Sequence, residues 1–463
     1  MFGFVLLTKQ CLFGSLVFMA LIIVLLEFLA TVQFTMMTTD GIRSSTKNIK
    51  NIYYGNHQDN MDSFETSMID EFYTKEQYSC KNKYYLTHVP NCSLLISADQ
   101  KEQHFARSFT KMCERNGASA EDYITMASDC ATFLRNRKYI MDATDEEFKF
   151  PVAFSILMYK DVNQVERLLR AIYRPHNYYC IHVDSSADPS VRKAMINIIN
   201  CLPNVYEATK STRVVWGKFS VLEPELVCMK DLLRYGDWKY FINLTGQEFP
   251  LKTNLQIVKI LKSVDGANSV DGIIERKWRS RWKMAGKPPH GIKPVKGNVH
   301  VVINRQFVDF AVNDNRSIDF IEWLNKTKIP DESFFNSLNH NPHLGIPGSF
   351  KGTNITTSWE TKPYFARYKN WGKQCTNPYF NFPCSGKRKR NICIFGIGDL
   401  PRLTSRMELF ANKFYWDYQS LTLDCIEEWH RKMIENEYNS TNGGQFNTSY
   451  YETMPYLKEV VKN

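Results

Sequence analysis

The segment from Phe150 to Asp184 constrains the fold more than any other part of the chain, because it reads as a strand, a helix and a second strand. Val152 to Met158 is an almost continuous apolar run, which is typical of a strand buried on both faces. Tyr178 to Val183 is a second such run. Between the two runs, apolar residues recur at helical spacing, at Val162, Val165, Leu168, Leu169 and Ile172. The segment therefore predicts two parallel strands joined by a helix.

The same alternation continues along the chain. Ala194 to Ile199 fits a helix, and Asn204 to Ala208 fits a strand. Pro224 is suited to the first turn of a further helix, and Trp238 to Leu244 reads as a fourth strand. Strands that alternate with helices of this length indicate a parallel sheet with right-handed crossovers. We expect an α/β fold in which a Rossmann-type, mostly parallel sheet is flanked by helices.

Asp184 directly follows the second strand of the first unit. In open parallel sheets, ligands bind just beyond the carboxyl ends of the strands. The sequence therefore predicts that Asp184 lies where the ribose or base of a nucleotide needs a hydrogen-bond acceptor. The alternative is that Asp184 only caps a helix.

The amino-terminal part of the chain predicts a membrane anchor. Residues 11–34 are almost wholly apolar apart from Glu27, and they are long enough to span a bilayer as a helix. Because no small-residue cleavage pattern lies close to this segment, we interpret it as an uncleaved signal anchor. The polar segment that follows has little periodicity and predicts a flexible stem. The expected organisation is a cytoplasmic tail, the anchor, the stem, a luminal catalytic domain and a C-terminal tail, over residues 1–10, 11–34, 35–78, 79–430 and 431–463.

Sequons and cysteines indicate that the domain after the anchor lies in an oxidising lumen. N-x-Ser/Thr triplets begin at Asn91, Asn315, Asn325, Asn354, Asn439 and Asn447. Another begins at Asn243, which the strand assignment buries. Of the 12 cysteines, 11 follow the anchor, and there is no C-x-x-C pair that would favour metal binding. These features predict a disulfide-bonded glycoprotein.

The charge of the chain does not by itself indicate its ligand. A net charge of +10 could suggest nucleic acid, but a luminal compartment argues against that partner. The cluster Lys387 to Arg390 lies between Cys384 and Cys393 and runs into an apolar segment. It fits either an anion site or a solvated face.

Several motifs of nucleotide enzymes are absent from the sequence. No Walker loop and no G-x-G-x-x-G follows a strand, so ATP hydrolysis and dinucleotide chemistry are poorly supported. No D-x-D triplet is present to hold a divalent ion against a sugar-nucleotide diphosphate. A departing diphosphate must still be stabilised, so Lys or Arg side chains would have to replace the ion. Arg390 and Lys413 are the candidates.

A transferase also needs a base that removes a proton from the acceptor hydroxyl. Pro330, Asp331 and Glu332 form a predicted turn before an aromatic helix. A carboxylate beside aromatic surface is desolvated and becomes more basic. The same P-D-E triplet also reads as an ordinary helix start.

Six segments together resemble the core 2 and I-branching β-1,6-N-acetylglucosaminyltransferases, which share a broader family with peptide O-xylosyltransferases. The segments are YYCIHVD, VVWGKFSVLEPELVCMKDLL, WKYFINLTGQEFPLKTN, IPDESFF, ICIFGIGDL and LFANKFYWD. They follow the order of the family from about Cys80 to Cys425, and this shared order makes the resemblance specific.

The resemblance implies a GT-A-like, inverting enzyme that works without a metal ion, so no cofactor is expected beside the UDP-sugar co-substrate. It implies that Glu332 is the general base, that Asp184 binds the uridine, and that Arg390 and Lys413 neutralise the diphosphate. It places acceptor contacts at Glu275, Arg279, Arg281 and Trp371. A surface helix of alternating charge is the alternative for these four positions.

The resemblance also implies four disulfides, namely Cys80–Cys425, Cys130–Cys201, Cys180–Cys228 and Cys384–Cys393. Cys92, Cys113 and Cys375 are then left over. The first two can pair with each other, in which case Cys375 is free or forms an intermolecular bond. Two positions depart from the family: Thr245 replaces its loop cysteine, and Lys373 replaces a tyrosine near the stacking tryptophan. These departures leave the preference for acceptor and donor open.

The resulting hypothesis is a single-pass type II enzyme of the Golgi membrane. It would transfer N-acetylglucosamine or a related hexose from a UDP-sugar to the 6-hydroxyl of a mucin-type O-glycan on a glycoprotein. A homodimer is compatible with this hypothesis, whereas a nucleic-acid partner is not expected. The alternatives are a peptide O-xylosyltransferase and a catalytically inactive glycan-binding protein of the same fold.

Overall fold

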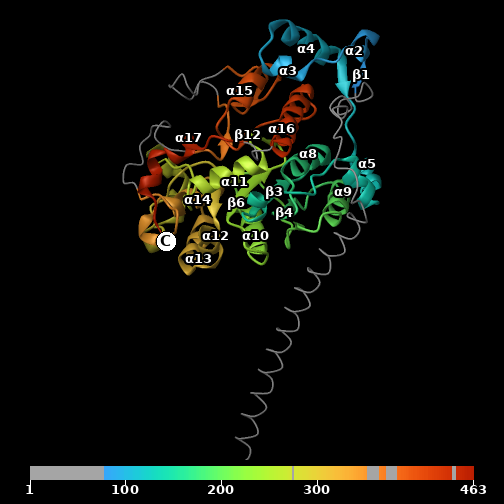
Figure 1. Ribbon diagram of the computed structural model, residues 1–463. Helices are drawn as coiled ribbons and strands as arrows, with labels where there is room; N and C mark the ends of the chain where they lie inside the picture. The colour runs from blue at the N-terminus through green and yellow to red at the C-terminus, as the bar shows by residue number, and fades with distance from the viewer. Residues whose placement is uncertain (1–77, 274–275, 352–363, 372–382, 441–444, 463) are drawn as a thin grey trace, which may run out of the picture. The chain divides into compact units, whose positions relative to one another are not determined.

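The computed structural model describes residues 78–273, 276–351, 364–371, 383–440 and 445–462 (Figure 1). The chain divides into two compact units, Met1–Phe72 and Tyr73–Asn463, and the described residues belong to the second. The predicted anchor and nearly all of the predicted stem thus lie outside the described residues. Among the described helices, none has both the length and the apolarity needed to cross a membrane.

A five-stranded sheet with the strand order β5-β4-β3-β6-β8 forms the centre of the domain. The strands β3 (Val152–Met158), β4 (Tyr178–Val183), β5 (Val205–Glu207) and β6 (Tyr240–Thr245) run parallel. β8 (Val302–Asn304) joins β6 in the antiparallel sense. The mostly parallel α/β sheet predicted from the periodicity is confirmed.

Helices cover both faces of this sheet, because side chains alternate between the two faces along each strand. On β3, Phe154 and Ile156 belong to the apolar cluster shared with α8, α9 and α11, whereas Ala153 belongs to the cluster shared with α10 and α12. Figure 1 shows α8 and α11 on the opposite side of the sheet from α10 and α12. The bounds of these helices are α8 Val162–Ile172, α9 Pro189–Asn200, α10 Glu223–Leu232, α11 Asn254–Ser263 and α12 Arg305–Asn313.

The helix starts follow from local sequence. Asp188 accepts a hydrogen bond from the amide of Ser190, and Pro189 occupies the first turn of α9. Thr253 and Gln256 form a capping box at the start of α11. The described helices outside the central layers are α2 Lys83–Thr87, α3 Cys92–Ile96, α4 Gln100–Met112, α5 Ala120–Met126, α6 Cys130–Asn136, α7 Asp145–Phe148, α13 Asn315–Leu324, α14 Phe334–Asn339, α15 Leu400–Thr404, α16 Leu421–Asn439 and α17 Ser449–Glu452.

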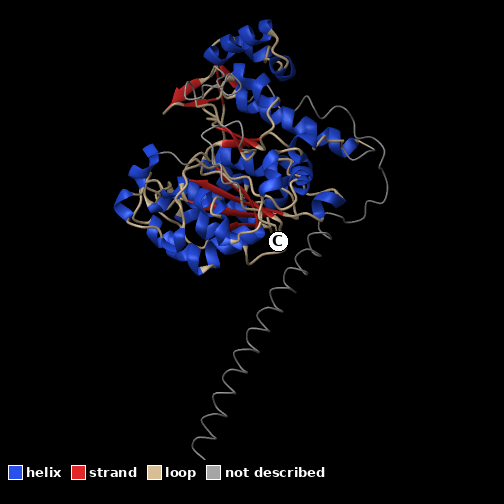
Figure 2. Ribbon diagram, turned by 90° about the vertical axis from the view of Figure 1, so that its left-hand side faces the viewer, coloured by secondary structure: helices blue, strands red, loops and turns tan. Residues whose placement is uncertain are grey.

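Three smaller strand groups are present beside the central sheet, and Figure 2 shows short strands above it. β12 (Phe410–Asn412) pairs antiparallel with β7 (Glu248–Pro250) and parallel with β9 (Arg367–Tyr368). This small sheet matters for function, because it carries residues beside the carboxyl edge of the central sheet. The two remaining antiparallel pairs are β1 (Tyr78–Cys80) with β2 (Cys113–Arg115), and β10 (Lys387–Lys389) with β11 (Ile392–Ile394).

A buried ion network joins α8 to α16. Each of the carboxylates of Glu166, Asp424 and Glu427 is paired with two guanidinium groups, which come from Arg115, Arg137, Arg167 and Arg170. For example, Arg167 Nη2 lies 2.7 Å from Asp424 Oδ1 and 2.5 Å from Glu427 Oε2. We call these seven residues the buried ion network.

The segment after residue 430 packs with the same domain. Residue 430, where the sequence placed the end of the catalytic domain, lies inside α16. Tyr451 and Tyr456 are buried in the core cluster of the central sheet, and Val460 forms a β-bridge with Phe350. Residues 431–463 are therefore not a separate tail over their described part, because their aromatic side chains complete the core.

Five disulfides are present among the described residues. The predicted pairs Cys130–Cys201, Cys180–Cys228 and Cys384–Cys393 are confirmed.

The predicted pair Cys80–Cys425 is wrong, as is the pairing of Cys92 with Cys113. Cys80 is bonded to Cys113, because these residues face each other across the β1–β2 ladder. Cys92 is bonded to Cys425, because α3 packs on α16. Cys375 lies outside the described residues.

Candidate functional site

Asp184 lies just beyond β4 at the carboxyl edge of the central sheet and is 6% exposed. Its Oδ1 accepts hydrogen bonds from Ser186 N (2.7 Å) and Ser186 Oγ (2.6 Å), and its Oδ2 accepts one from Val214 N (2.9 Å). Burial raises the pKa of Asp184, but the hydrogen bonds outweigh it and hold the pKa below its ordinary value. A carboxylate has about four acceptor positions, so one position remains for a ligand.

Lys413 and Arg390 lie near each other, as the predicted diphosphate site requires. Lys413 directly follows β12, and its backbone oxygen accepts a hydrogen bond from Phe395 N (3.0 Å). Arg390 is exposed in the turn between β10 and β11. Burial lowers the pKa of Lys413, and the neighbouring charges of Lys389 and Arg390 lower it further. The β10–β11 hairpin and β12 thus bring three cations together.

Glu332 ends η7 (Pro330–Glu332), the short turn that precedes α14. Tertiary contacts fix this turn from two sides. Ile329 N donates to Gly217 O (3.1 Å), and Glu332 O accepts from Gly297 N (2.9 Å). Ile329 has a φ of 54°, a conformation that a β-branched residue seldom adopts. The surrounding structure therefore imposes a strained backbone at the residue that precedes the turn of the predicted base.

Two cations contact the Glu332 carboxylate. Glu332 Oε2 lies 2.6 Å from Arg281 Nη1 and 3.9 Å from Lys296 Nζ. The Arg281 guanidinium and the Lys296 ammonium both lie over the ring of Trp278, 4.7 Å and 5.2 Å from its centroid. Because the Glu332 side chain is 29% exposed, a ligand can still reach it.

Asp331 is the more buried carboxyl group of the turn. Burial raises the pKa of Asp331 to about 6, and the adjacent charge of Glu332 adds to the shift. Its Oδ1 has no hydrogen-bond partner among the described residues. The sequence predicted desolvation of a carboxyl group in this turn, and the structure places that desolvation at Asp331.

Lys369 and Trp371 lie in the segment that follows β9. Lys369 Nζ lies 5.8 Å from the ring centroid of Trp371. The electrostatic neighbours of Lys369 include Glu332 and Lys296. Burial lowers the pKa of the Lys369 ammonium to about 8. The structure thus brings together the predicted residues Glu332 and Arg281, and it places the predicted Trp371 beside Lys369, which is within electrostatic reach of Glu332.

Glu248 on β7 is a fully buried carboxylate near both Lys369 and Lys413. Arg367 Nη2 lies 3.1 Å from Glu248 Oε2, and His300 Nε2 lies 2.5 Å from Glu248 Oε1. Burial raises the pKa of Glu248, but Arg367 and His300 outweigh it and bring the pKa to about 2. Both Lys369 and Lys413 lie within electrostatic reach of Glu248, so this carboxylate connects the two groups of cations.

Arg279 and Glu275 complete the predicted acceptor residues. Arg279 lies in η4 (Arg276–Arg281), and its side chain is exposed. Glu275 lies outside the described residues. Our sequence reasoning missed Lys296 and Lys369, because neither lies in a segment whose pattern distinguishes it from a surface lysine.

The described sequons are on the surface, with one exception. Exposed asparagines occur at positions Asn91, Asn315, Asn325, Asn439 and Asn447. Asn243 is only 3% exposed, and its Nδ2 donates to Val299 O (2.8 Å), so it is closed to modification in the folded domain. Asn354 lies outside the described residues.

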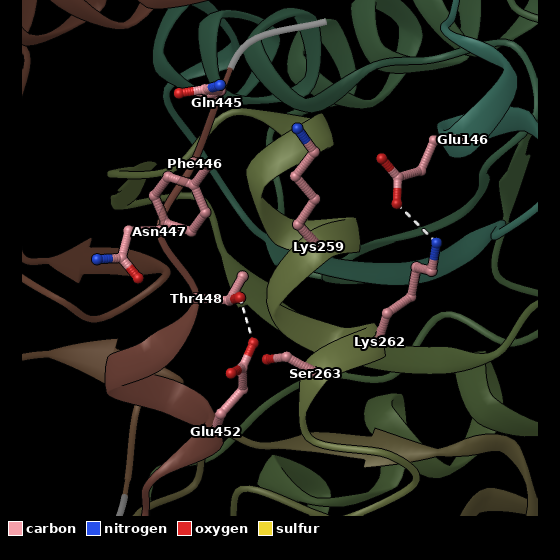
Figure 3. Close-up of a pocket in the computed structure, with 9 residues that line it drawn as sticks. All are labelled: Glu146, Lys259, Lys262, Ser263, Gln445, Phe446, Asn447, Thr448 and Glu452. Atoms are coloured by element: carbon pink, nitrogen blue, oxygen red, sulfur yellow. Dashed lines mark hydrogen bonds and ion pairs between the residues drawn. The ribbon is translucent and has the colours of Figure 1, made fainter.

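A pocket of about 840 Å³ lies away from the residues described above (Figure 3). It is lined from α11 by Lys259, Lys262 and Ser263, and its other lining residues are Glu146, Gln445, Phe446, Asn447, Thr448 and Glu452. Figure 3 shows Lys262 directed toward Glu146, to which its Nζ is paired at 2.6 Å. Apart from the predicted glycosylation site at Asn447, none of the predicted site residues lines this pocket.

Potential metal ligands come together in one group among the described residues, formed by Cys384, Cys393 and Asp399. The two sulfur atoms of this group are joined in a disulfide, so they are not available as thiolate ligands.

Comparisons with known proteins identify the family of the chain. The sequence pattern of the Core-2/I-Branching enzyme family matches residues 152–404, which include the central sheet, the turn of Glu332 and the β10–β11 hairpin.

Named relatives are similar over most of their length. The chain is 33% identical to a beta-1,3-galactosyl-O-glycosyl-glycoprotein beta-1,6-N-acetylglucosaminyltransferase from Homo sapiens, over 73% of this chain and 84% of that protein. It is 33% identical to a second human protein of that name, numbered 3, over 77% of this chain and 87% of that protein. A protein of the same name from Bovine herpesvirus 4 (strain DN-599) is 33% identical over 74% of this chain and 82% of its own.

Proposed function

The chain belongs to the Core-2/I-Branching enzyme family, a family of glycosyltransferases, and from that premise we propose the following reaction. The protein transfers N-acetylglucosamine, or a related hexose, from a UDP-sugar to the 6-hydroxyl of a mucin-type O-glycan, with inversion at the anomeric carbon. The observation that carries this proposal is the Glu332 carboxylate. It is part-exposed, held by Arg281 on a strained turn, and lies within the family match.

In the proposed step, Glu332 accepts the proton of the acceptor 6-hydroxyl while the hydroxyl oxygen attacks the anomeric carbon of the donor. The bond from that carbon to the diphosphate oxygen breaks, and UDP leaves with the electron pair. Arg281 holds Glu332 Oε2 at 2.6 Å and so fixes the orientation of the base. Trp371 offers an apolar ring face against which an acceptor sugar can pack.

The donor is proposed to bind at the edge formed by Asp184 and by the cations beside β12. Asp184 keeps one acceptor position for the uridine. Lys413 and Arg390 neutralise the diphosphate, and Lys389 lies with them. We propose that these cations replace a divalent metal ion, because a cation placed where negative charge develops lowers the barrier to departure. Lys413 is partly desolvated, which strengthens its interaction with a phosphate oxygen.

The proposed location is the Golgi membrane, with a type II anchor at residues 11–34 and the described domain in the lumen. Support comes from the five disulfides and from the exposed sequons. Enzymatic removal of N-glycans from the cell-expressed protein should increase its gel mobility, and protease applied to sealed vesicles should leave the domain intact. Cleavage of the domain in sealed vesicles would contradict the proposed topology.

The full chain in detergent, incubated with UDP-sugars and core 1 disaccharide, tests the reaction. We expect transfer to the disaccharide that persists in EDTA, with the new linkage at the 6-hydroxyl by NMR. Transfer of xylose to a serine peptide would favour the xylosyltransferase alternative. Tight glycan binding without transfer from any UDP-sugar would favour an inactive binding protein. Transfer that stops in EDTA and returns with a divalent ion would refute the replacement of the metal.

A further inference from the structure

Among the described residues, the surroundings of Glu332 contain more cations than this one carboxylate requires. Arg281 already pairs with Glu332 at 2.6 Å, and Lys296 lies beyond it at 3.9 Å. Lys369 has neither a hydrogen bond nor an ion pair with any residue that the structure describes, and its electrostatic neighbours include both Glu332 and Lys296. Asp331, with a pKa raised by burial to about 6, offsets at most one of these charges.

The backbone holds Lys296 in place. Ile273 N donates to Lys296 O (2.6 Å), and Lys296 N donates to Ile273 O (3.1 Å), which forms an isolated β-bridge. The next residue, Gly297, donates its N–H to Glu332 O (2.9 Å). The Lys296 side chain is 14% exposed and lies over Trp278. A lysine that is fixed, mostly desolvated and distant from its nearest acid binds an added anion at low entropic cost.

Lys369 is positioned by the small sheet. It directly follows β9, which pairs with β12, and its ammonium lies over Trp371. Glu248, the other carboxylate near Lys369, is already paired with Arg367 and His300. Burial lowers the pKa of Lys369 to about 8, and no described carboxylate forms an ion pair with its ammonium.

From this geometry we propose that Lys296 and Lys369 form a subsite for an acidic substituent, a carboxylate or a sulfate, on the acceptor glycan. This inference rests on the proposed function, since it assigns the acceptor class of the same site. Trp278 and Trp371 supply the aromatic faces beside the two ammonium groups, so a sugar ring can pack there while its acidic group meets the lysines. Ammonium groups act as point charges and accept either anion.

The competing assignment is that the two lysines bind the donor diphosphate. The group of Lys413, Lys389 and Arg390 already provides three cations for that purpose. Lys369 follows β9, which pairs with the strand that precedes Lys413, so the donor assignment has to be tested directly. The two assignments differ in a measurable way, because a donor residue changes the affinity for UDP and an acceptor residue changes the preference among acceptors.

The test uses the full chain in detergent with UDP-N-acetylglucosamine and three acceptors. The acceptors are core 1 disaccharide, its 3-O-sulfated form, and the form that carries sialic acid on galactose. The measured quantity is the ratio of kcat/KM for each acidic acceptor to that for the neutral one. We expect this ratio to fall about tenfold in Lys296→Met, about tenfold in Lys369→Met and about a hundredfold in the double variant.

The matched control is Lys293→Met, since Lys293 lies on the same segment with an exposed side chain. It should keep the wild-type ratio. Calorimetric binding of the sulfated and sialylated disaccharides supplies a second readout that needs no turnover, and it should show the same loss in the double variant. Circular dichroism confirms that each variant is folded.

The outcomes separate the two proposals. Transfer to core 1 disaccharide with an acidic-to-neutral ratio that does not change in the variants overturns the subsite and leaves the proposed function standing. A loss of UDP affinity in Lys369→Met with an unchanged ratio also overturns it, in favour of the donor assignment. Lysine-dependent binding of an acidic glycan without transfer from any UDP-sugar supports the subsite and refutes the proposed function.

Discussion

The buried ion network and the surroundings of Glu332 use similar residues in opposite ways. In the network, each carboxylate is shared by two guanidinium groups, and Arg167 is only 1% exposed. Around Glu332, one carboxylate meets one guanidinium and one more distant ammonium, and the Glu332 side chain is 29% exposed.

The two clusters differ in how completely their charged groups are paired with one another. A guanidinium group matches the geometry of a carboxylate and fills its acceptor positions, so the network has no capacity left for a ligand. It links α8 to α16. The Glu332 group keeps exposed surface, and its ammonium groups outnumber the described carboxylates that pair with them, which leaves charge available for a substrate. A charged cluster is therefore a candidate binding site when some of its charged groups lack partners within the protein.

The largest expected effect is on catalysis. Glu332→Gln keeps the size of the side chain and removes its basicity, so kcat should fall about 10² to 10⁴-fold, the usual contribution of a general base. Affinity for UDP, measured by calorimetry, should be largely kept. The control is Glu322→Gln, the same chemical change at an exposed position of α13. A Glu332→Gln enzyme with wild-type kcat would remove Glu332 from the mechanism.

Breaking the network should instead affect stability. Arg167→Met leaves Asp424 and Glu427 with fewer partners in a buried place, so the free energy of unfolding should fall by about 3–5 kcal/mol, measured by denaturant titration. Arg135→Met, at an exposed position of α6, should change it little. If the two variants were equally stable, the network would not hold the helices together as described.

Removal of a donor cation should have an intermediate effect. Lys413→Met and Arg390→Met should each weaken UDP binding about tenfold, because each removes one charge-assisted contact to a phosphate oxygen. Lys387→Met is the control. Lys387 lies on the same hairpin as Arg390, but its ammonium lies over the ring of Tyr418. Unchanged UDP affinity in both test variants, by calorimetry, would show that the diphosphate binds elsewhere.

The smallest expected effect is a pH dependence of the acceptor preference, which comes from Lys369 in the incomplete cluster. The pKa of Lys369 is about 8, lowered by burial and by Arg367 and Lys296 against the opposing charges of Glu248 and Glu332. Lys369 is therefore charged below pH 8 and loses its charge as the pH rises through that value. The preference for an acidic acceptor should decline by up to about tenfold between pH 7 and pH 9.

In Lys369→Met, this decline should be absent while the rest of the pH profile is kept. A wild-type preference that stays constant from pH 7 to pH 9 would contradict the role of Lys369. The same measurement on Arg135→Met should reproduce the wild-type curve.

The part of the molecule that sequence reasoning anticipated is the part with strong local patterns. The apolar run of β3, the helical spacing of α8 and the position of Asp184 beyond β4 were all predicted correctly, because burial between two helix layers imposes its period on the sequence. The turn of Glu332 before α14 was also located, since Pro330 and the aromatic residues mark it.

The pairing of Cys80 and Cys92 could not be predicted from local sequence patterns. Cys80 and Cys92 are both near the start of the described domain, and no local pattern distinguishes which of them reaches α16. The choice depends on the β1–β2 register and on the packing of α3, which are contacts between distant segments.

The sequence by itself determined the layered α/β sheet, the edge at which Asp184 lies and the segment that carries Glu332, because each depends on periodicity or on residues adjacent in the chain. Only the tertiary structure decided that Arg281 and Lys296 meet at Glu332 and that Lys369 lies within electrostatic reach of it. These side chains come from separate segments, and whether a lysine is solvated or becomes part of a binding site depends on the neighbours that folding brings to it.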